Sequence, residues 1–227
     1  MSEPAKIYLL HGMGRTPASM LVLAARLKGA GYGVGLFGYS VTVESLDSIV
    51  ERFVERVRSE VGGAGKPEDY AVVGHSLGNV ITRMAIPQLP PGFQRFVMLA
   101  PPNQSARSAS MLRQNPLFRA ITRDTGQRLA DPAFYQALPR PETPSLIVAG
   151  TAGPRRWWPL GPEPNDGVLT LAETALEGVP RLEIPALHTW LMNRKDVFQA
   201  IHGFLQEPRD LRGGEPGGSG SIPTAAS

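Results

Sequence analysis

Short apolar runs alternate along the chain with longer stretches in which apolar residues recur every three or four positions. Runs of about five apolar or β-branched residues predict buried strands, and the three-to-four spacing predicts amphipathic helices. The predicted strands cover residues 6–10, 33–38, 70–73, 96–100, 146–149 and 181–184. This alternation predicts an α/β fold with a mostly parallel central sheet of about six strands, flanked by helices.

The clearest helical pattern covers residues 44–61, where apolar residues form one side of the predicted helix and Glu and Arg residues form the opposite side. Another helix is expected after Thr16-Pro17, with Thr16 as N-cap and Pro17 at the first helical position. A third follows residue 78 and stops at Pro87. Shorter helices are expected through Leu171 and Leu176, and over residues 197–205.

Two segments depart from this alternation. Residues 103–140 carry six arginines, five of which alternate with apolar residues, and are interrupted by Pro116 and Pro132, which predicts an insertion of short helices. Residues 207–227 are rich in Gly, Pro, Ser and charge, and have almost nothing to bury, so we expect a disordered tail. The prediction is therefore one domain over residues 1–206 with an insertion at about 103–140 and a C-terminal tail.

The rest of the chain is organised around Gly74-His75-Ser76-Leu77-Gly78. A β-branched run precedes this segment and a helical pattern follows it. Gly74 and Gly78 remove the β-carbons that would collide in so sharp a turn, so Ser76 can sit on a strained elbow with its hydroxyl exposed. The Gly-x-Ser-x-Gly spacing is weak evidence alone, and the alternative is a glycine-rich turn with an incidental serine; the flanking strand and helix favour the elbow.

A serine hydroxyl becomes a nucleophile only when a base removes its proton. Of the four histidines, His75 points away from its neighbour in an elbow, His11 is better placed to brace a turn, and His202 lies within a helical pattern. His188 follows the last predicted strand, at the sheet edge where the elbow also lies. We therefore expect His188 to be the base, the alternative being a structural histidine.

The imidazole needs a carboxylate that holds its tautomer. Asp166 lies in the loop after the fifth predicted strand, and Gly167 suits a tight turn that presents its side chain. The alternative for Asp166 is a plain Asn-Asp-Gly surface turn. Rival carboxylates, which lie in a proline-rich loop, on a helix or in the insertion, are Glu163, Glu173, Asp131 and Asp124.

Negative charge that develops on a substrate oxygen is stabilised by preorganised backbone N–H groups. Leu77, directly after Ser76 and at a helix N-terminus, is one candidate donor. The second should come from His11-Gly12-Met13-Gly14, where Met13 is preferred to Gly12. A plain glycine turn is the alternative.

These pieces, in the order serine, acid, histidine, resemble the α/β-hydrolase fold superfamily, and within it the small bacterial esterases and lipases. The resemblance covers residues 5–206. It implies that Ser76 is the acylated nucleophile, Asp166 and His188 complete the triad, and Met13 and Leu77 form the oxyanion hole. The chain lacks the first two strands of larger members and has Asn79 where many lipases carry another glycine.

The resemblance also implies a lid at residues 103–140 that covers the site and shapes an acyl pocket. Trp157 and Trp158 could line that pocket or contact a lipid surface, and ordinary loop packing is the alternative. The arginines of the insertion could favour anionic substrates, although a solvated basic face explains them as well.

Composition narrows the function classes. The 227 residues carry a formal charge of +3 and no cysteine, which argues against a nucleic-acid footprint, a disulfide framework and a zinc ribbon. The first apolar run is too short for a signal peptide or a membrane span, so we expect a cytoplasmic protein with no integral membrane segment. Gly-x-Gly-x-x-Gly at residues 33–38 follows a helix and forms a strand, which is the wrong context for a nucleotide site.

The sequence thus predicts a serine hydrolase that needs no cofactor or metal and cleaves a small-molecule acyl ester or lipid through an acyl-enzyme. Thioesterase, amidase or acyltransferase activity would use the same triad, and a non-catalytic binding protein could keep the same fold. The sequence leaves the acyl length and the oligomeric state open.

Overall fold

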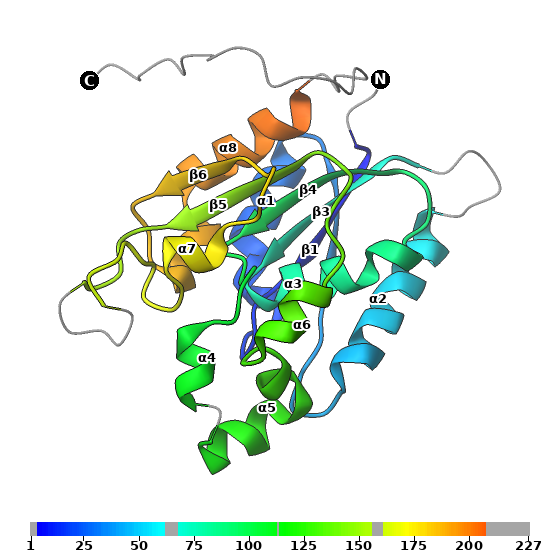
Figure 1. The fold of residues 1–227 in the computed structure, drawn as a ribbon. Coiled ribbons are helices and arrows are strands. Elements are labelled where there is room, and N and C mark those ends of the chain that lie inside the picture. Colours follow the sequence, from blue (N-terminus) through cyan, green and yellow to red (C-terminus); the bar gives the residue numbers. More distant parts are fainter. Residues whose placement is uncertain (1–3, 62–67, 113, 156–160, 208–227) are drawn as a thin grey trace, which may run out of the picture.

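A sheet of parallel strands forms the centre of the molecule (Figure 1). The computed structural model describes residues 4–61, 68–112, 114–155 and 161–207, and within them six strands lie in the order β2-β1-β3-β4-β5-β6. Every neighbouring pair is parallel, which confirms the expected fold class. The strands are β1 (Lys6–Leu10), β2 (Gly33–Phe37), β3 (Tyr70–His75), β4 (Phe93–Leu99), β5 (Ser145–Gly150) and β6 (Arg181–Ile184).

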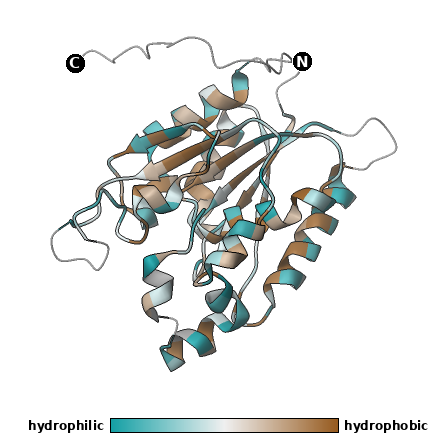
Figure 2. Ribbon diagram, in the orientation of Figure 1, coloured by the Kyte–Doolittle hydropathy of each residue, from teal (hydrophilic) through white to brown (hydrophobic). Residues whose placement is uncertain are grey.

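Helices cover both faces of the sheet. One face carries α1 (Leu21–Gly29) and α8 (Lys195–Gln206), and the other carries α2 (Leu46–Val61), α3 (Leu77–Ala85) and α6 (Pro132–Ala137). Successive strand residues point to opposite faces, so Ile7 and Leu9 join the core beneath α1 and α8 while Tyr8 and Leu10 join the core beneath α2 and α3. The central strands β1, β3, β4 and β5 are accordingly apolar along most of their length, whereas the edge strand β6 carries Arg181 and Glu183 (Figure 2).

Two helix starts differ from the prediction. Thr16 precedes a short 3₁₀ turn, η1 (Pro17–Met20), its side chain makes no capping hydrogen bond, and the α-helix begins only at Leu21. The helix expected from residue 44 begins at Leu46. The Glu44 carboxylate, in the turn before it, accepts hydrogen bonds from the Ser40 N–H and from the guanidinium of Arg52 on the helix. The spacing of apolar residues therefore does not resolve where either α-helix begins.

The insertion between β4 and β5 folds into α4 (Arg107–Leu112), α5 (Pro116–Arg128) and α6. Helix α5 rests against the loop between β2 and α2, where the Thr42 hydroxyl donates to the Ile121 carbonyl at 3.1 Å. Arg128 also makes two hydrogen bonds, of 2.8 and 2.6 Å, to the Asp47 carboxylate. The insertion is therefore attached to the loop that leaves the carboxyl end of β2 and to the first turn of α2.

Two short elements complete the carboxyl edge of the sheet: α7 (Leu171–Thr174) follows the loop after β5, and the 3₁₀ helix η3 (His188–Asn193) follows β6. No helix in the described part of the chain is both long and apolar enough to cross a membrane. The predicted tail, after Glu207, lies outside the described residues.

Candidate active site

Ser76 occupies the sharp turn between β3 and α3. Its φ of 51° and ψ of −117° place a non-glycine residue in a strained region that costs about 1–3 kcal/mol. The Ser76 N–H donates to the Leu99 carbonyl of β4 at 2.9 Å, and the Ser76 carbonyl accepts from the N–H and the side-chain amide of Asn79 at 3.0 and 3.1 Å. Asn79, where many lipases carry glycine, thus helps to hold the strained turn.

The two glycines of the elbow are required by close backbone approaches. A β-carbon on Gly74 would lie 2.8 Å from the Asn79 nitrogen, and one on Gly78 would lie 2.6 Å from the Leu10 carbonyl oxygen. Both distances are shorter than packed atoms allow, so only glycine fits. Ser76 itself is half-buried between fully buried neighbours, which leaves its side chain at the surface of the carboxyl edge.

Asp166 and His188 meet at this edge. The Nδ1 of His188 lies 2.7 Å from Oδ2 of Asp166, and the His188 N–H donates to the Asp166 carbonyl at 2.9 Å. The other carboxylate oxygen, Oδ1, accepts from the N–H groups of Val168 and Leu169 at 2.9 and 2.8 Å. Because a carboxylate can only accept, Nδ1 carries the proton and Nε2 is left as the basic nitrogen. The structure therefore brings together the two residues that the sequence predicted as acid and base.

The rival carboxylates have other partners. Glu173 completes a capping box at the start of α7, and Asp131 caps α6 by accepting from the Ala133 N–H at 3.0 Å. Glu163 pairs with Arg107 at 3.2 Å, and Asp124 lies 3.6 Å from Arg128. Each of these carboxylates thus has a partner other than His188.

The turn after β1 lies directly against the elbow. A β-carbon on Gly12 would be 3.2 Å from the Ser76 β-carbon and 2.8 Å from Nδ1 of His75. Met13, the next residue, is half-buried and packs against the core beneath α2 and α3. In the described part of the chain, no acceptor bonds the N–H of Met13 or of Leu77, so both donors remain for another molecule.

His11 braces this turn. Its Nδ1 donates to the Gly12 carbonyl at 2.8 Å, its Nε2 accepts from the Tyr39 N–H at 3.4 Å, and the two rings stack with centroids 4.1 Å apart. The Tyr39 hydroxyl donates to the His11 carbonyl. Burial lowers the pKa of His11, which keeps the imidazole neutral with one donating and one accepting nitrogen.

His75 joins the elbow to His188. The ring is 1% exposed, and its Nε2 lies 3.0 Å from the His188 carbonyl, to which it donates. Burial, with the charge of His188 as the next cause, holds the pKa of His75 well below its usual range. A neutral His75 therefore ties the residue before the serine to the residue predicted as its base.

A cavity of about 460 Å³ opens beside the turn that follows β1. Its walls include Met13 from that turn, Tyr39 and Val41 from the loop after β2, and Ile121 from α5. The insertion thus contributes one wall of a largely apolar space next to Ser76's elbow. Trp157 and Trp158, predicted as possible pocket residues, lie outside the described residues.

No cluster of three or more His, Asp or Glu side chains in the described residues could share a metal ion. The described residues bring together at this edge a serine, a histidine–carboxylate pair and the N–H groups of Met13 and Leu77.

Comparison with known proteins supplies the family. The sequence profile of the alpha/beta hydrolase family matches residues 7–219. The chain belongs to this family. A search of curated protein sequences finds no match.

Solved structures of other α/β hydrolases share the fold at low sequence identity. The mature lipase BlEst2 of Bacillus licheniformis is 15% identical, with a TM-score of 0.71 over 90% of this chain and 93% of the lipase. The metagenomic carboxyl esterase MGS0156 is 15% identical, with a TM-score of 0.66 over 91% of this chain and 76% of the esterase. A lipase-esterase related protein from Clostridium acetobutylicum is 16% identical, with a TM-score of 0.58 over 89% and 95% of the two chains.

The sequence did not predict three residues of this α/β hydrolase site, whose places depend on contacts between distant segments: Tyr39, His75 and Ile121. Tyr39 carries no motif, although its place just after β2 is where ligands gather in parallel sheets. His75 was expected to point away from its neighbour, and its bond to the His188 carbonyl has no signal in the sequence. Ile121 comes from the insertion, whose position over the turn depends on the contacts of α5 with residues 42 and 47.

Proposed function

We propose that this α/β hydrolase is a serine hydrolase that cleaves carboxylic esters through an acyl-enzyme intermediate. The observation that carries the proposal is the Asp166–His188 hydrogen bond of 2.7 Å, held against the strained serine turn by the His75–His188 contact. The basic Nε2 of His188 is thereby kept at the edge of the sheet where Ser76 lies.

In the proposed reaction the Ser76 oxygen attacks the ester carbonyl carbon while Nε2 of His188 takes the hydroxyl proton. The C=O bond becomes a C–O⁻ bond, and the N–H groups of Met13 and Leu77 stabilise that charge. The tetrahedral intermediate collapses as His188 returns the proton to the leaving alcohol, which leaves Ser76 acylated. Water then repeats the sequence, with His188 as base and then acid, and releases the carboxylic acid.

Asp166 acts on this cycle through His188. Its carboxylate fixes the tautomer that leaves Nε2 free and offsets the positive charge that the imidazole gains. The bonds from the Val168 and Leu169 N–H groups hold the carboxylate in place, so the imidazole does not need to be reoriented at the moment of proton transfer.

The cavity beside Met13 supports a place for the acyl group. Its volume of about 460 Å³ and its lining by Met13, Val41 and Ile121 suit an apolar chain. The lid implied for the insertion would act there, since Ile121 of α5 forms one wall. The neighbouring structures described as a lipase and as a carboxyl esterase are consistent with an ester substrate.

The test is hydrolysis of a p-nitrophenyl ester series from acetate to palmitate. We expect activity in the wild type, loss in Ser76→Ala to the level without enzyme, and no change in Ser59→Ala, which alters an exposed serine on α2. The chain length with the highest kcat/KM reports the size of the acyl pocket. A folded wild type that hydrolyses none of the series, or a Ser76→Ala variant that keeps its activity, would contradict the proposal.

A further inference from the structure

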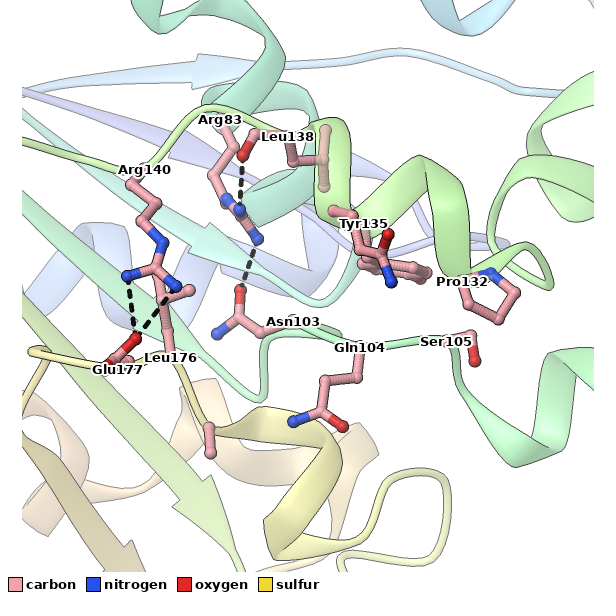
Figure 3. A pocket seen from close by; sticks show the side chains of 12 residues that line it. Arg83, Asn103, Gln104, Ser105, Pro132, Tyr135, Leu138, Arg140, Leu176 and Glu177 are labelled. Atoms are coloured by element: carbon pink, nitrogen blue, oxygen red, sulfur yellow. Dashed lines mark hydrogen bonds and ion pairs between the residues drawn. The ribbon is translucent and has the colours of Figure 1, made fainter.

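A second cavity, of about 620 Å³, lies beyond α3 and shares no lining residue with the 460 Å³ cavity beside the turn that follows β1. It is an open cavity lined by the loop after β4, by α6 and by the segment after α7 (Figure 3). Its polar lining includes Arg83, Asn103, Gln104, Ser105, Arg140 and Glu177. Two of these side chains are cations and one is an anion, so the excess charge of the cavity is positive.

Arg83 is a buried cation with neutral partners. The side chain, on the last turn of α3, is 2% exposed. Its Nε and Nη2 donate to the carbonyls of Pro139 and Leu138, both at 2.9 Å, and its Nη1 donates to Oδ1 of Asn103 at 3.1 Å. Within the described part of the chain, no carboxylate lies at ion-pairing distance from Arg83. A buried charge without a counter-charge is unfavourable, and a ligand that supplied one would be bound.

The positive charge persists at neutral pH. Burial, followed by the repulsion of Arg140, lowers the pKa of Arg83 to about 10, which still leaves the guanidinium protonated. Three of the five N–H groups of a guanidinium make the bonds described above, so two remain for another acceptor.

Arg140 supplies a second guanidinium at the mouth of the cavity. Both of its Nη groups donate to one oxygen of Glu177 at 3.2 Å, but the two side chains are 64% and 84% exposed. An ion pair this exposed contributes little and exchanges readily with another anion. The repulsion between Arg140 and Arg83 would be relieved by negative charge placed between them.

Neutral donors complete the lining. The side chains of Gln104 and Ser105 make no hydrogen bond with any described residue, and both line the cavity. Figure 3 shows them on the loop that also carries Asn103, the side chain bonded to Arg83.

We propose that this cavity is a binding site for a small anionic ligand, whose carboxylate or phosphate group lies between the guanidinium groups of Arg83 and Arg140. The planar fork of a guanidinium matches both kinds of oxyanion, and Gln104 and Ser105 donate to the remaining oxygens. The site is distinct from the proposed active site and does not depend on its chemistry.

The experiment is isothermal titration of the full chain with succinate and, separately, with inorganic phosphate, at constant ionic strength set by sodium chloride. The variants are Arg140→Gln, which removes the second cation, and Gln104→Glu, which adds a negative charge to the lining. Both positions are exposed, so the fold is retained. Arg58→Gln is the control, because Arg58 is also an exposed arginine paired with a glutamate, Glu55, but lies on α2 outside the cavity.

We expect saturable binding to one site in the wild type and in Arg58→Gln, and affinity at least about tenfold weaker in Arg140→Gln and in Gln104→Glu. The tighter of the two anions identifies the ligand as a carboxylate or a phosphate. Wild-type protein that binds neither anion saturably overturns the proposal, and so does unchanged affinity in either cavity variant.

Discussion

Replacement of Asp166 by asparagine should invert the tautomer of His188. Oδ1 of Asp166 accepts from two backbone N–H groups, those of Val168 and Leu169. The side-chain oxygen of an asparagine would take the position of Oδ1 and accept these two bonds. If the amide were flipped, its NH₂ group would face two N–H donors and could bond to neither. The NH₂ group then points at Nδ1 of His188, which must accept, so the imidazole proton moves to Nε2. The nitrogen needed as base is thereby blocked.

The expected loss in kcat is about 10⁴-fold, or about 5.5 kcal/mol of transition-state stabilisation, as is typical when a triad histidine is held in the wrong tautomer. Stability should change little, because the asparagine keeps the same number of hydrogen bonds in the same buried place. Loss of activity without loss of the folded state is therefore the signature of the mechanism.

The assay combines p-nitrophenyl ester kinetics with thermal unfolding. Asp131→Asn is the matched control, because Asp131 caps α6 from the surface and asparagine caps helices equally well. We expect this control to keep wild-type kcat. If Asp166→Asn keeps more than about a tenth of the wild-type kcat, the assignment of Asp166 as the orienting acid is refuted.

Three further predictions follow from the packing around the site. Gly12→Ala should lower kcat/KM about 100-fold, because the new β-carbon would lie 2.8 Å from Nδ1 of His75 and displace the turn proposed to stabilise the oxyanion. Gly29→Ala is the control, since open space surrounds Gly29, and it should match the wild type in ester kinetics. Ile121→Trp should fill the 460 Å³ cavity and lower the ratio of kcat/KM for the octanoate ester to kcat/KM for the acetate ester about tenfold. Leu117→Trp is the control, because Leu117 is on the same helix but outside the cavity, and it should leave that ratio unchanged. The free energy of unfolding should fall as the pH drops below about 6.5, by about 1.4 kcal/mol per pH unit for one group. In the unfolded chain the histidine takes up a proton in this range, whereas buried His75 stays unprotonated because its pKa is lowered. Urea unfolding on either side of that pH measures this fall, which should be smaller in His75→Gln; an equal fall in both proteins would show that another group is responsible.

The fold could be predicted because strand and helix patterns are local. The apolar runs of β1, β3 and β4 are long enough to be recognised as strands, and the alternation with helices dictates a parallel sheet. Ser76 could be predicted for the same reason, because the residues that form the elbow are consecutive in the sequence. Its two glycines are required because a β-carbon on either would lie 2.6 to 2.8 Å from a backbone atom.

The remaining features of the site depend on contacts between distant segments. The bond from His75 to the His188 carbonyl joins residues 113 positions apart, and the stacking of His11 on Tyr39 joins residues 28 apart. The cavity wall at Ile121 depends on how α5 docks on the loop after β2. No periodicity or motif encodes these contacts, because they arise only when the carboxyl ends of the strands come together.

Covalent labelling by a fluorophosphonate probe tests the central claim most directly. The probe reacts only with a serine that a neighbouring base has activated in a site that stabilises the oxyanion. We expect mass spectrometry of the digested protein to find one adduct, on Ser76, formed in parallel with the loss of ester hydrolysis. A folded protein that carries no adduct, or an adduct on another residue, would contradict the account.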